Sequence, residues 1–435
     1  MISTAAALRA QLGDQSLAAP ESQMTPGSLK YPVLTLPYEI TVEIFLHFVS
    51  LMRQVLSRPQ PYYGLLRLAS VCQTWRAVTL STCTLWNDIF IPTYDGDAGQ
   101  LLKVCLLRAG SLPLDLHIWQ LPEDVCSMDM LFSTLSLYGS QWRRIHLSSP
   151  AMRRIFLIDR FPSSLPLLEC LTLSDLRVLH KSVSSPRHAP QLRELSVRNS
   201  LLAIQLGLPF DRLTKLDLSH FTITELLAVL PYTLNLESLQ LAKATKHTPV
   251  VTPSILLPHL HTFGCRGDPS TMVLQYLTLP ALERLVLVYL YDAGVHAILL
   301  CVARSCSTIR TLNINRLAFN LAYDCLCSLP AIRNLCLSCS WSLYDEDVFF
   351  AAMISGGCIP ALESLTCKGY RPMRADKLFA VVSARWRGVE GTAKLNSVSL
   401  DFAKEDTEFA NTFDQLYELG RQGLKLEITG VGVTR

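Results

Sequence analysis

The chain has 435 residues, of which 49% are hydrophobic and 17% charged, so it can bury a large core and is not disordered as a whole. Its 39 basic and 36 acidic residues give a formal net charge of +3, which is too balanced to indicate nucleic-acid binding. Its apolar runs all fall short of the ~18 residues that a membrane-spanning helix needs.

Residues 1–33 are predicted to form a disordered or frayed tail. The opening segment, MISTAAALRAQLGDQ, lacks the basic region and solid apolar stretch of a secretory signal. The 14 cysteines follow no disulfide-scaffold spacing, and the sequence has no Asn-x-Ser/Thr acceptor site. We therefore expect buried, reduced thiols in an intracellular protein of the cytoplasm, the nucleus or both.

A first helix is predicted over residues 35–49, TLPYEITVEIFLHFV. Pro37 lies where the first helical turn tolerates proline, and Glu39 lies near the positive end of the helix dipole. An apolar stripe follows one side of this helix and contains Ile40, Ile44, Phe45, Phe48 and Val49.

A second helix is predicted after SRPQPYYG, whose prolines and glycine break any continuation of the first. Its apolar stripe is Leu65, Leu68, Cys72 and Trp75, with spacings of three, four and three. Cys72 is expected to pack on this helical face, because neither a base nor a metal-ligand partner stands at a suitable spacing. Two short helices cannot bury an ordinary core by themselves, so the apolar stripes imply a partner surface.

The order of these residues resembles the F-box. The family pattern is Leu-Pro with a following acidic residue, then Ile-Phe, then Val-Cys with Trp three residues later, and a closing Leu-Trp. All of these elements are present: Leu36, Pro37, Glu39, Ile44, Phe45, Val71, Cys72, Trp75, Leu85 and Trp86. The segment LMRQVLSRPQPYYG (51–64) is longer than the usual link between the first two helices and is expected to enlarge a loop.

The resemblance places an F-box at residues 34–91. Residues 92–138 are then expected to be a linker and a first, atypical capping region of the following domain. Within them, LLRAGSLPLDLHI (106–118) is similar to the segment after the F-box in the expanded F-box families of mushroom-forming fungi.

From residue 139 to the end, the phrase Pro-x-Leu-x-x-Leu-x-Leu recurs. Its central apolar position falls at Ile145, Leu171, Leu195, Leu216, Leu239, Phe263, Leu285, Leu312, Leu335, Leu365 and Val398. Most of the successive spacings are leucine-rich-repeat periods, with stretched units near the end. Helical stretches stand between the phrases at 222–230, 293–306, 345–357, 374–386 and 408–420.

These features predict an α/β fold: a small all-α F-box module followed by an irregular leucine-rich-repeat solenoid over residues 139–435, with a parallel sheet backed by helices. One departure from the standard repeat is the residue after the strand, where Asn or Cys is usual. This chain has Leu176, Ser200, Phe221, Ala244, Asp268, Leu290 and Ser340 there. The turns must therefore satisfy their backbone groups in another way.

Alternate strand residues point to the open face of the sheet, opposite the helices. In the middle of the repeats they form an apolar patch rimmed by Arg and Asn, which is the composition of an interface centre. The predicted target-binding residues are Arg266, Arg284, Val286, Val288, Asn313 and Asn315. The competing interpretation is that the C-terminal segment or a long loop covers these valines as ordinary core.

Four cysteines close in sequence, Cys325, Cys327, Cys336 and Cys339, could bind zinc. The repeat register argues against it, because it puts Cys336 on the open face and the first two cysteines in the preceding segment. The sequence contains no phosphate loop, no G-x-S-x-G and no H-E-x-x-H. We expect no catalytic residue, cofactor or metal, and neither nucleic acid nor membrane as a partner.

The resemblance implies a substrate-recognition subunit of an SCF-type (Skp, cullin, F-box) E3 ubiquitin ligase. Its F-box would bind the Skp adaptor, and thereby a cullin, while the repeats bind a target protein. The implied adaptor-binding residues are Leu36, Pro37, Ile40, Ile44, Phe45, Val71, Cys72, Trp75, Leu85 and Trp86. Two alternatives stay open: a non-catalytic scaffold that binds Skp without ubiquitination, and a cysteine- or metal-dependent enzyme on a repeat fold.

Overall fold

The computed structural model describes residues 35–55, 63–91, 96–120, 125–148, 161–174, 188–197, 207–245, 254–289, 292–315, 319–338, 346–369, 375–402 and 410–430. The chain divides into two compact units. Unit 1 comprises residues 1–197 with 202–209, and unit 2 comprises residues 198–201 with 210–435. The predicted tail at 1–33 lies outside the described residues.

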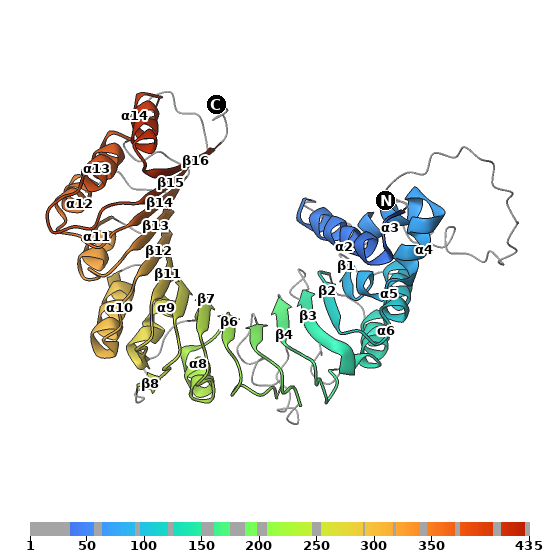
Figure 1. Ribbon diagram of the computed structural model, residues 1–435. Helices are drawn as coiled ribbons and strands as arrows, with labels where there is room; N and C mark the ends of the chain where they lie inside the picture. Colours follow the sequence, from blue (N-terminus) through green and yellow to red (C-terminus); the bar gives the residue numbers. More distant parts are fainter. Residues whose placement is uncertain are drawn as a thin grey trace, which may run out of the picture. The chain divides into compact units, whose positions relative to one another are not determined.

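Unit 1 opens with a helical module that consists of α2 (Tyr38–Val55), α3 (Tyr63–Val71), α4 (Gln73–Ser81) and the short 3-10 helix Cys83–Leu85. Strands and helices follow in the order β1 (Asp88–Ile91), α5 (Gly96–Ala109), β2 (Leu114–Ile118), α6 (Val125–Ser136), β3 (Trp142–Ser148), β4 (Cys170–Ser174) and β5 (Glu194–Val197). Each strand pairs in parallel with the next, from β1 to β5 (Figure 1).

Unit 2 begins with β6 (Lys215–Ser219), α8 (Ile223–Val229), β7 (Ser238–Ala242), β9 (Thr262–Arg266), α9 (Asp268–Thr271), β11 (Arg284–Val288) and α10 (Asp292–Ser305). It continues with β12 (Thr311–Asn315), α11 (Phe319–Cys327), β13 (Asn334–Ser338), α12 (Glu346–Ser355), β14 (Ser364–Gly369), α13 (Ala375–Arg387), β15 (Ser397–Phe402), α14 (Ala410–Arg421) and β16 (Lys425–Gly430). The short strands β8 (Ile255–Leu256) and β10 (Leu277–Thr278) form a separate parallel pair.

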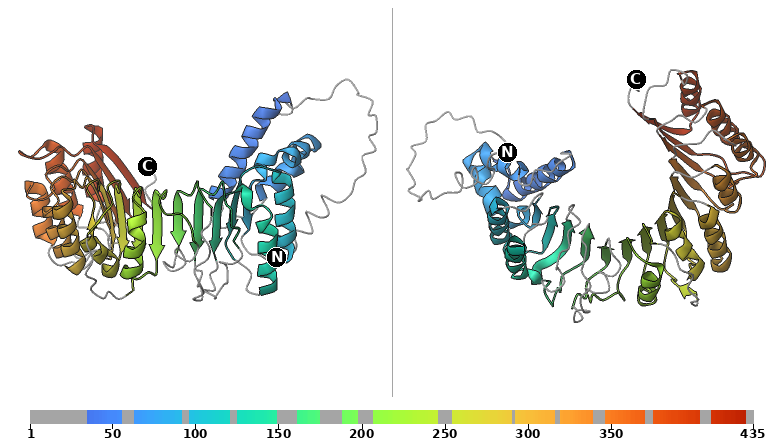
Figure 2. Two further views of the ribbon diagram at one scale, coloured as in Figure 1. Left: turned by 90° about the horizontal axis from the view of Figure 1, so that it is seen from below. Right: turned by 180° about the vertical axis from the view of Figure 1, so that it is seen from behind.

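The sheet of unit 2 runs in the order β6-β7-β9-β11-β12-β13-β14-β15-β16, with every described pairing parallel. Helices α10 to α14 line one face of this sheet (Figure 2). The predicted α/β architecture, a helical module followed by a parallel sheet backed by helices, is therefore confirmed. Among the described helices, none combines the length and apolar character needed to cross a bilayer.

The core follows the repeated phrase. In unit 1 the residues in register across the strands are Ile89, Leu116, Ile145, Leu171 and Leu195. In unit 2 they are Leu216, Leu239, Phe263, Leu285, Leu312, Leu335, Leu365, Val398 and Leu426. The eleven predicted central positions, from Ile145 to Val398, thus lie in register within their units and are buried, whereas Leu426 of β16 is half-buried.

The sheet extends beyond the strands that the phrase predicted. Strands β1 and β2 precede residue 139, the first residue of the predicted repeat domain, and β16 follows the last predicted strand. These strands were missed because they keep only part of the phrase: LDLHI has the Leu-x-Leu alternation without the full leading Pro-x-Leu-x-x.

The turns after the strands replace the missing Asn with left-handed backbone. The first residue after β6, β7, β9 and β11 has a positive φ: His220 (57°), Lys243 (53°), Gly267 (82°) and Tyr289 (57°). Three of their N–H groups continue the inter-strand ladder: His220 donates to Ala242 (3.1 Å), Gly267 to Val288 (2.7 Å) and Tyr289 to Asn315 (3.0 Å). Backbone hydrogen bonds thus serve three of these four turns in place of an Asn side chain.

Candidate functional site

The helical module is built around Phe45 of α2, whose side chain is 0% exposed. Its ring meets that of Trp75 of α4 edge to face, with centroids 4.9 Å apart. Leu65 and Leu68 of α3 are buried as well. Edge-to-face packing of two large rings fixes α2 against α4.

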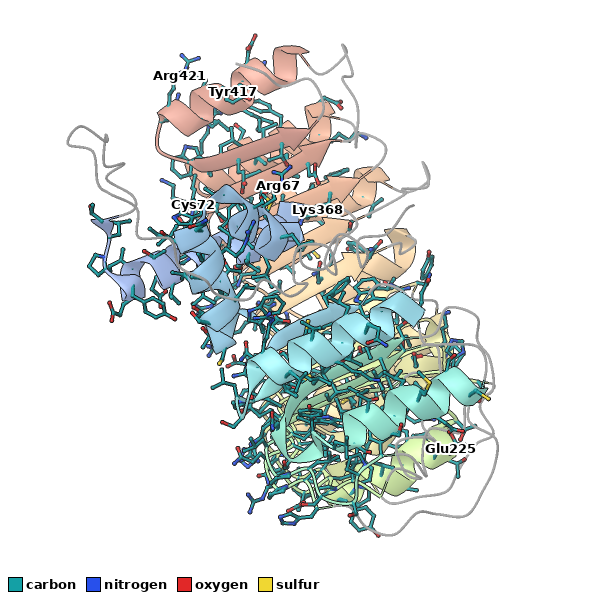
Figure 3. All side chains as sticks on the ribbon, turned by 90° about the vertical axis from the view of Figure 1, so that its right-hand side faces the viewer. Arg67, Cys72, Glu225, Lys368, Tyr417 and Arg421 are labelled. Atoms are coloured by element: carbon teal, nitrogen blue, oxygen red, sulfur yellow. The ribbon has the colours of Figure 1, made fainter. Side chains whose placement is uncertain are left out.

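Cys72 ends one helix and begins the next, so the predicted continuous second helix is wrong (Figure 3). Its backbone is extended, with φ −158° and ψ 171°, and its Sγ accepts a hydrogen bond from the N–H of Trp75 at 3.4 Å. Across the break, the Arg76 Nε donates to the carbonyl oxygen of Ala69 at 2.9 Å. The side chains of Cys72 and Arg76 thereby serve backbone groups that a helix end leaves without intrahelical partners.

The long link between the first two helices is also partly helical. Helix α2 continues to Val55, so residues 51–55 do not belong to a loop as predicted. Leucine, methionine, arginine and glutamine at 51–54 are all good helix formers, which explains the extension. Residues 56–62 of the link lie outside the described residues.

Apolar side chains remain exposed on the helical module. Leu36, Ile40 and Ile44 follow one another at spacings of four, and their exposed fractions are 38%, 48% and 43%. Val71, at the end of α3, is 59% exposed. Residues four apart lie on one side of a helix, and a group of exposed large apolar residues marks an interaction surface.

The predicted adaptor-binding residues therefore divide into three groups. Leu36, Pro37, Ile40, Ile44 and Val71 are exposed, Cys72 and Trp75 are half-buried, and Phe45, Leu85 and Trp86 are buried. Sequence spacing alone does not separate these groups, because exposed and buried residues alternate along the same helices.

The helical module is fixed to the strands of its own unit through α5. The guanidinium of Arg108 lies 5.1 Å from the centre of the Trp86 ring and donates from Nη1 to the carbonyl oxygen of Leu80 at 2.9 Å. The indole Nε1 of Trp86 donates to the carbonyl oxygen of Thr79 at 2.7 Å. Trp86 is thus an anchor between α4 and α5.

The predicted target-binding residues lie on three adjacent strands of unit 2. Val286 pairs in register with Gly264 and Asn313, and Val288 pairs with Arg266 and Asn315. Both valines are half-buried on the face opposite Leu285 and Leu287, which are 0% exposed. Arg266 and Arg284 are exposed.

One residue of this face escaped sequence reasoning. The carboxamide of Gln240 from β7 lies over the Cα of Gly264, in the space that a Cβ atom at position 264 would occupy. Gly264 stands in register with Gln240 on one side and with Val286 on the other. Only the strand order shows that Gln240 belongs to the same row across the open face.

The cysteines considered for zinc lie on different faces. Cys325 is 0% exposed on α11, whereas Cys336 is half-buried on the open face of β13, and Cys339 lies outside the described residues. Burial raises the pKa of Cys325 to about 12. Burial and contact with Cys327 also raise the pKa of Cys358. These thiols stay protonated near neutral pH, which disfavours thiolate chemistry.

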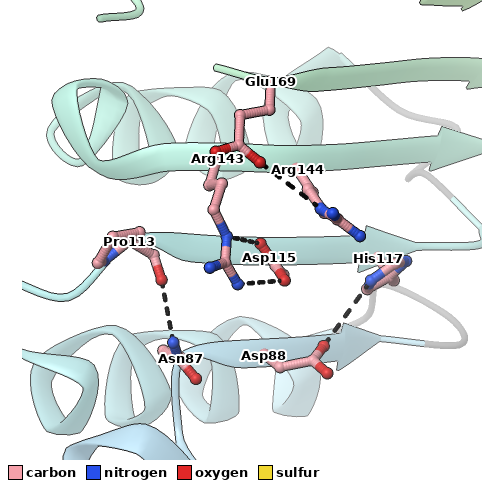
Figure 4. A network of polar contacts seen from close by, with 8 residues as sticks. All are labelled: Asn87, Asp88, Pro113, Asp115, His117, Arg143, Arg144 and Glu169. Atoms are coloured by element: carbon pink, nitrogen blue, oxygen red, sulfur yellow. Dashed lines mark hydrogen bonds and ion pairs between the residues drawn. The ribbon is translucent and has the colours of Figure 1, made fainter. Parts of the chain in front are cut away.

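Within the described ranges, no group of three His, Cys, Asp or Glu side chains is placed to hold a metal ion. Polar contacts instead link the strands of unit 1. Arg143 binds Asp115 through two bonds, from Nε at 2.9 Å and from Nη2 at 2.7 Å (Figure 4). Arg144 lies 4.0 Å from Glu169, and His117 lies 3.7 Å from Asp88.

Comparison with known protein families gives one match, and no curated protein gives a significant match to the chain. Residues 33–92 match the family described as F-box-like. The matched segment contains α2, α3 and α4 with their exposed apolar residues, and it ends directly after β1. F-box domains in general bind Skp proteins, which is an adaptor role without catalysis. The helical module of this chain is therefore an F-box-like domain, followed by a parallel sheet backed by helices.

Proposed function

We propose that this chain is the substrate-recognition subunit of an SCF-type E3 ubiquitin ligase. The F-box-like domain binds a Skp adaptor, which links the chain to a cullin, and the sheet binds a target protein. The observation that carries the proposal is the exposed apolar pair Ile40 and Ile44 on α2, with exposed Leu36 just before the helix, in a segment that matches an F-box-like domain. Such a surface loses its contact with water when a partner helix or loop covers it.

Leu36, Pro37, Ile40, Ile44 and Val71 are proposed to contact the adaptor directly. Phe45, Leu85 and Trp86 act through the fold, because their side chains are almost wholly buried. Cys72 and Trp75 belong to both groups, since they are half-buried at the turn between α3 and α4. Burial of the exposed residues against the adaptor supplies the binding affinity, and the buried residues hold the exposed ones in position.

We propose that residues 139–435 form a leucine-rich-repeat-like domain, after an F-box at residues 34–91. The segment 92–138 between them is proposed to be a linker and the first, atypical capping region of that domain, and it contains α5, β2 and α6.

The open face around Val286 and Val288 is the proposed target surface. Two half-buried valines flanked by Arg266 and Asn315 combine an apolar centre with a polar rim. The chain would then bring the target close to a ubiquitin-conjugating enzyme, and the rate gain would come from proximity. No residue of this chain need react.

The test is co-purification of the full chain with a Skp protein and a cullin. Ile40→Asp with Ile44→Asp should abolish recovery of Skp, because two charges would enter an apolar interface. Leu107→Asp is the matched control, since Leu107 is a leucine 74% exposed on α5 of the same unit. Unchanged Skp recovery by the double variant would overturn the proposal.

Recovery of a cullin distinguishes the proposed ligase subunit from the main alternative, a scaffold that binds Skp without ubiquitination. Recovery of Skp without a cullin, and without ubiquitination of a captured protein, would identify the chain as a Skp-binding scaffold. A cysteine- or metal-dependent enzyme has less support, because burial raises the pKa of the described thiols Cys325, Cys336 and Cys358.

A further inference from the structure

Two exposed arginines flank the valines of β11 on the open face of unit 2. Arg284 is the first residue of β11, and Arg266 is the last residue of the neighbouring strand β9. Because side chains alternate along a strand, Arg284, Val286 and Val288 point to the same face. Val288 pairs in register with Arg266, so the second arginine lies beside the far end of the apolar pair. The valines thus form an apolar centre with one arginine at each end.

Strand register sets the distance between the two arginines. Arg284 and Val288 are four residues apart on one strand, which corresponds to about 13 Å between their Cα atoms. Arg266 stands beside Val288 on the next strand, about 4.8 Å away. The Cα atoms of the two arginines are therefore about 14 Å apart, with the valines between them.

Acidic side chains are absent from the middle of this face. From β7 to β14, the described strand residues that point to the open face include no acid, and the cations among them are Arg266, Arg284 and Lys368. The acids of the described face lie toward its two ends, on β6, β15 and β16, and are Asp217, Asp401 and Glu427. Lys368 stands in register with Asp401, whereas the residues in register with the two arginines are all uncharged.

Neither arginine is paired within the described part of the chain. Glu283, which directly precedes Arg284, lies with its Oε1 atom 3.7 Å from Nη1 of Arg310. No described carboxylate lies within ion-pair distance of Arg266 or Arg284. A guanidinium pairs with a carboxylate through two parallel hydrogen bonds. Each arginine therefore has this bonding capacity available for a carboxylate of a ligand.

Neutral polar side chains surround the apolar centre. Asn313 and Asn315 of β12 stand in register with the two valines and are half-buried. On the other side, the carboxamide of Gln240 lies over Gly264 of β9. A carboxamide both donates and accepts hydrogen bonds, as the N–H and C=O groups of a peptide backbone do. These groups suit an extended polypeptide, whose backbone groups are not bonded to one another.

We propose that this face binds an extended acidic segment of the target protein, with the order acid-x-apolar-x-acid. Alternate side chains of an extended chain point to one side, and its residues i and i+4 lie about 13 Å apart. That distance matches the separation of the two arginines. One carboxylate pairs with Arg284 and the other with Arg266, while the central apolar side chain covers the valines.

The charge and spacing of the arginines favour carboxylates over phosphates. A phosphate group carries about 1.5–2 negative charges and three acceptor oxygens. A single arginine neutralises one charge, and the second arginine is about 14 Å away. A carboxylate, with one charge and two oxygens, is matched by one guanidinium. The inference rests on the proposed function, because the target protein supplies the segment, and it adds the chemical class of that segment.

The experiment is fluorescence anisotropy of the full chain with labelled Gly/Ser peptides that contain Glu-Gly-Leu-Gly-Glu. Two further peptides carry Gln or phosphoserine in place of both Glu residues. The glutamate peptide is expected to bind at least about tenfold more tightly than the glutamine peptide, which forms no charged pairs. A peptide with its two glutamates three residues apart should bind about threefold more weakly, since its carboxylates point to opposite sides.

Variants locate the binding on the chain. Arg284→Gln and Arg266→Gln should each weaken binding of the glutamate peptide about fivefold, and the double variant should bind the glutamate and glutamine peptides equally. Arg333→Gln is the matched control and should change nothing, because it removes the same charge from an exposed arginine that lies 3.4 Å from Glu363. Val286→Ala should weaken binding of both peptides by the same factor, about threefold.

The melting temperature and Skp recovery of each arginine variant should equal those of the parent chain. Equal binding of the glutamate and glutamine peptides by the parent, tighter binding of the phosphoserine peptide, or a preference for glutamate that persists in the double arginine variant would each overturn the proposal. Absence of binding by all peptides would overturn it as well. Failure of the parent chain to recover Skp would instead contradict the proposed function, while binding of the glutamate peptide would still stand.

Discussion

The Sγ atom of Cys72 accepts a hydrogen bond from the backbone N–H of Trp75, and this 3.4 Å contact caps α4. The cysteine is thereby explained without catalysis. It stops α3, starts α4, and sets Trp75 on the turn that faces Phe45. A residue whose spacing fits an apolar stripe thus acts mainly as a cap.

Replacing the thiol tests this role. Cys72→Ala should lower the free energy of unfolding by about 1 kcal/mol, because the cap is lost, whereas Cys72→Ser should keep it, since serine is a preferred cap residue. Thermal denaturation of the full chain measures both. Cys83→Ala, at an exposed cysteine two residues beyond α4, is the control. Equal losses in the alanine and serine variants would show that packing, not capping, is the role of Cys72.

Leu36 and Pro37, just before α2, test whether exposed residues bind the adaptor without supporting the core. Leu36→Ala combined with Pro37→Ala should weaken Skp binding by about 2 kcal/mol, some thirtyfold, because exposed apolar anchors are removed. Calorimetric titration with purified Skp protein measures this loss. The melting temperature should change little, since both residues are exposed.

Phe45→Ala is the contrasting variant. It should destabilise the F-box-like domain by about 3–5 kcal/mol, because a wholly buried ring is removed from its contact with Trp75. Trp75→Ala should weaken Skp binding and stability together. A Phe45→Ala variant as stable as the parent would contradict the observed core.

The valines of β11 test the target surface. Val286→Asp with Val288→Asp should abolish target capture and leave Skp binding and the melting temperature nearly unchanged, because both side chains are only half-buried on the open face. Affinity purification with the proteasome inhibited, followed by mass spectrometry, measures capture. Leu287→Asp is the matched control on the same strand and should unfold the unit, because Leu287 is 0% exposed. A large stability loss in the double variant would show that the valines are core.

His146 should make stability depend on pH. Burial lowers its pKa in the folded chain below the ordinary value of about 6.5 that it has when unfolded. As the pH falls through that value, the unfolded chain takes up a proton that the folded chain resists, so the free energy of unfolding decreases. Well above pH 6.5 the ring is neutral in both states, so His146 no longer makes the free energy of unfolding depend on pH.

The measurement is the difference in melting temperature between pH 7.5 and pH 5.5. His146→Gln should reduce that difference, since glutamine does not titrate. Leu107→Gln, at an exposed leucine of α5 that does not titrate, should leave it unchanged. A difference identical in the parent and the His146→Gln variant would contradict the assigned effect.

The sequence by itself determined the repeating part of the architecture, apart from β1, β2 and β16. Every predicted central position from Ile145 to Val398 lies on a strand, and the described pairings among these strands join consecutive members such as Leu171 and Leu195. Strand alternation and repeat period are local properties, so they can be recognised in the sequence without knowledge of the fold. The helices at 222–230 and 293–306 were predictable for the same reason.

Only the tertiary structure decided which of these residues form surfaces. Ile44 and Phe45 are neighbours on one apolar stripe, yet the first is 43% exposed and the second is 0% exposed. Phe90 and His146 are distant in sequence, and both contact the ring of His117 only because β1, β2 and β3 pair in register. Burial and proximity depend on which elements pack together, and that choice is made by long-range contacts that no local pattern encodes.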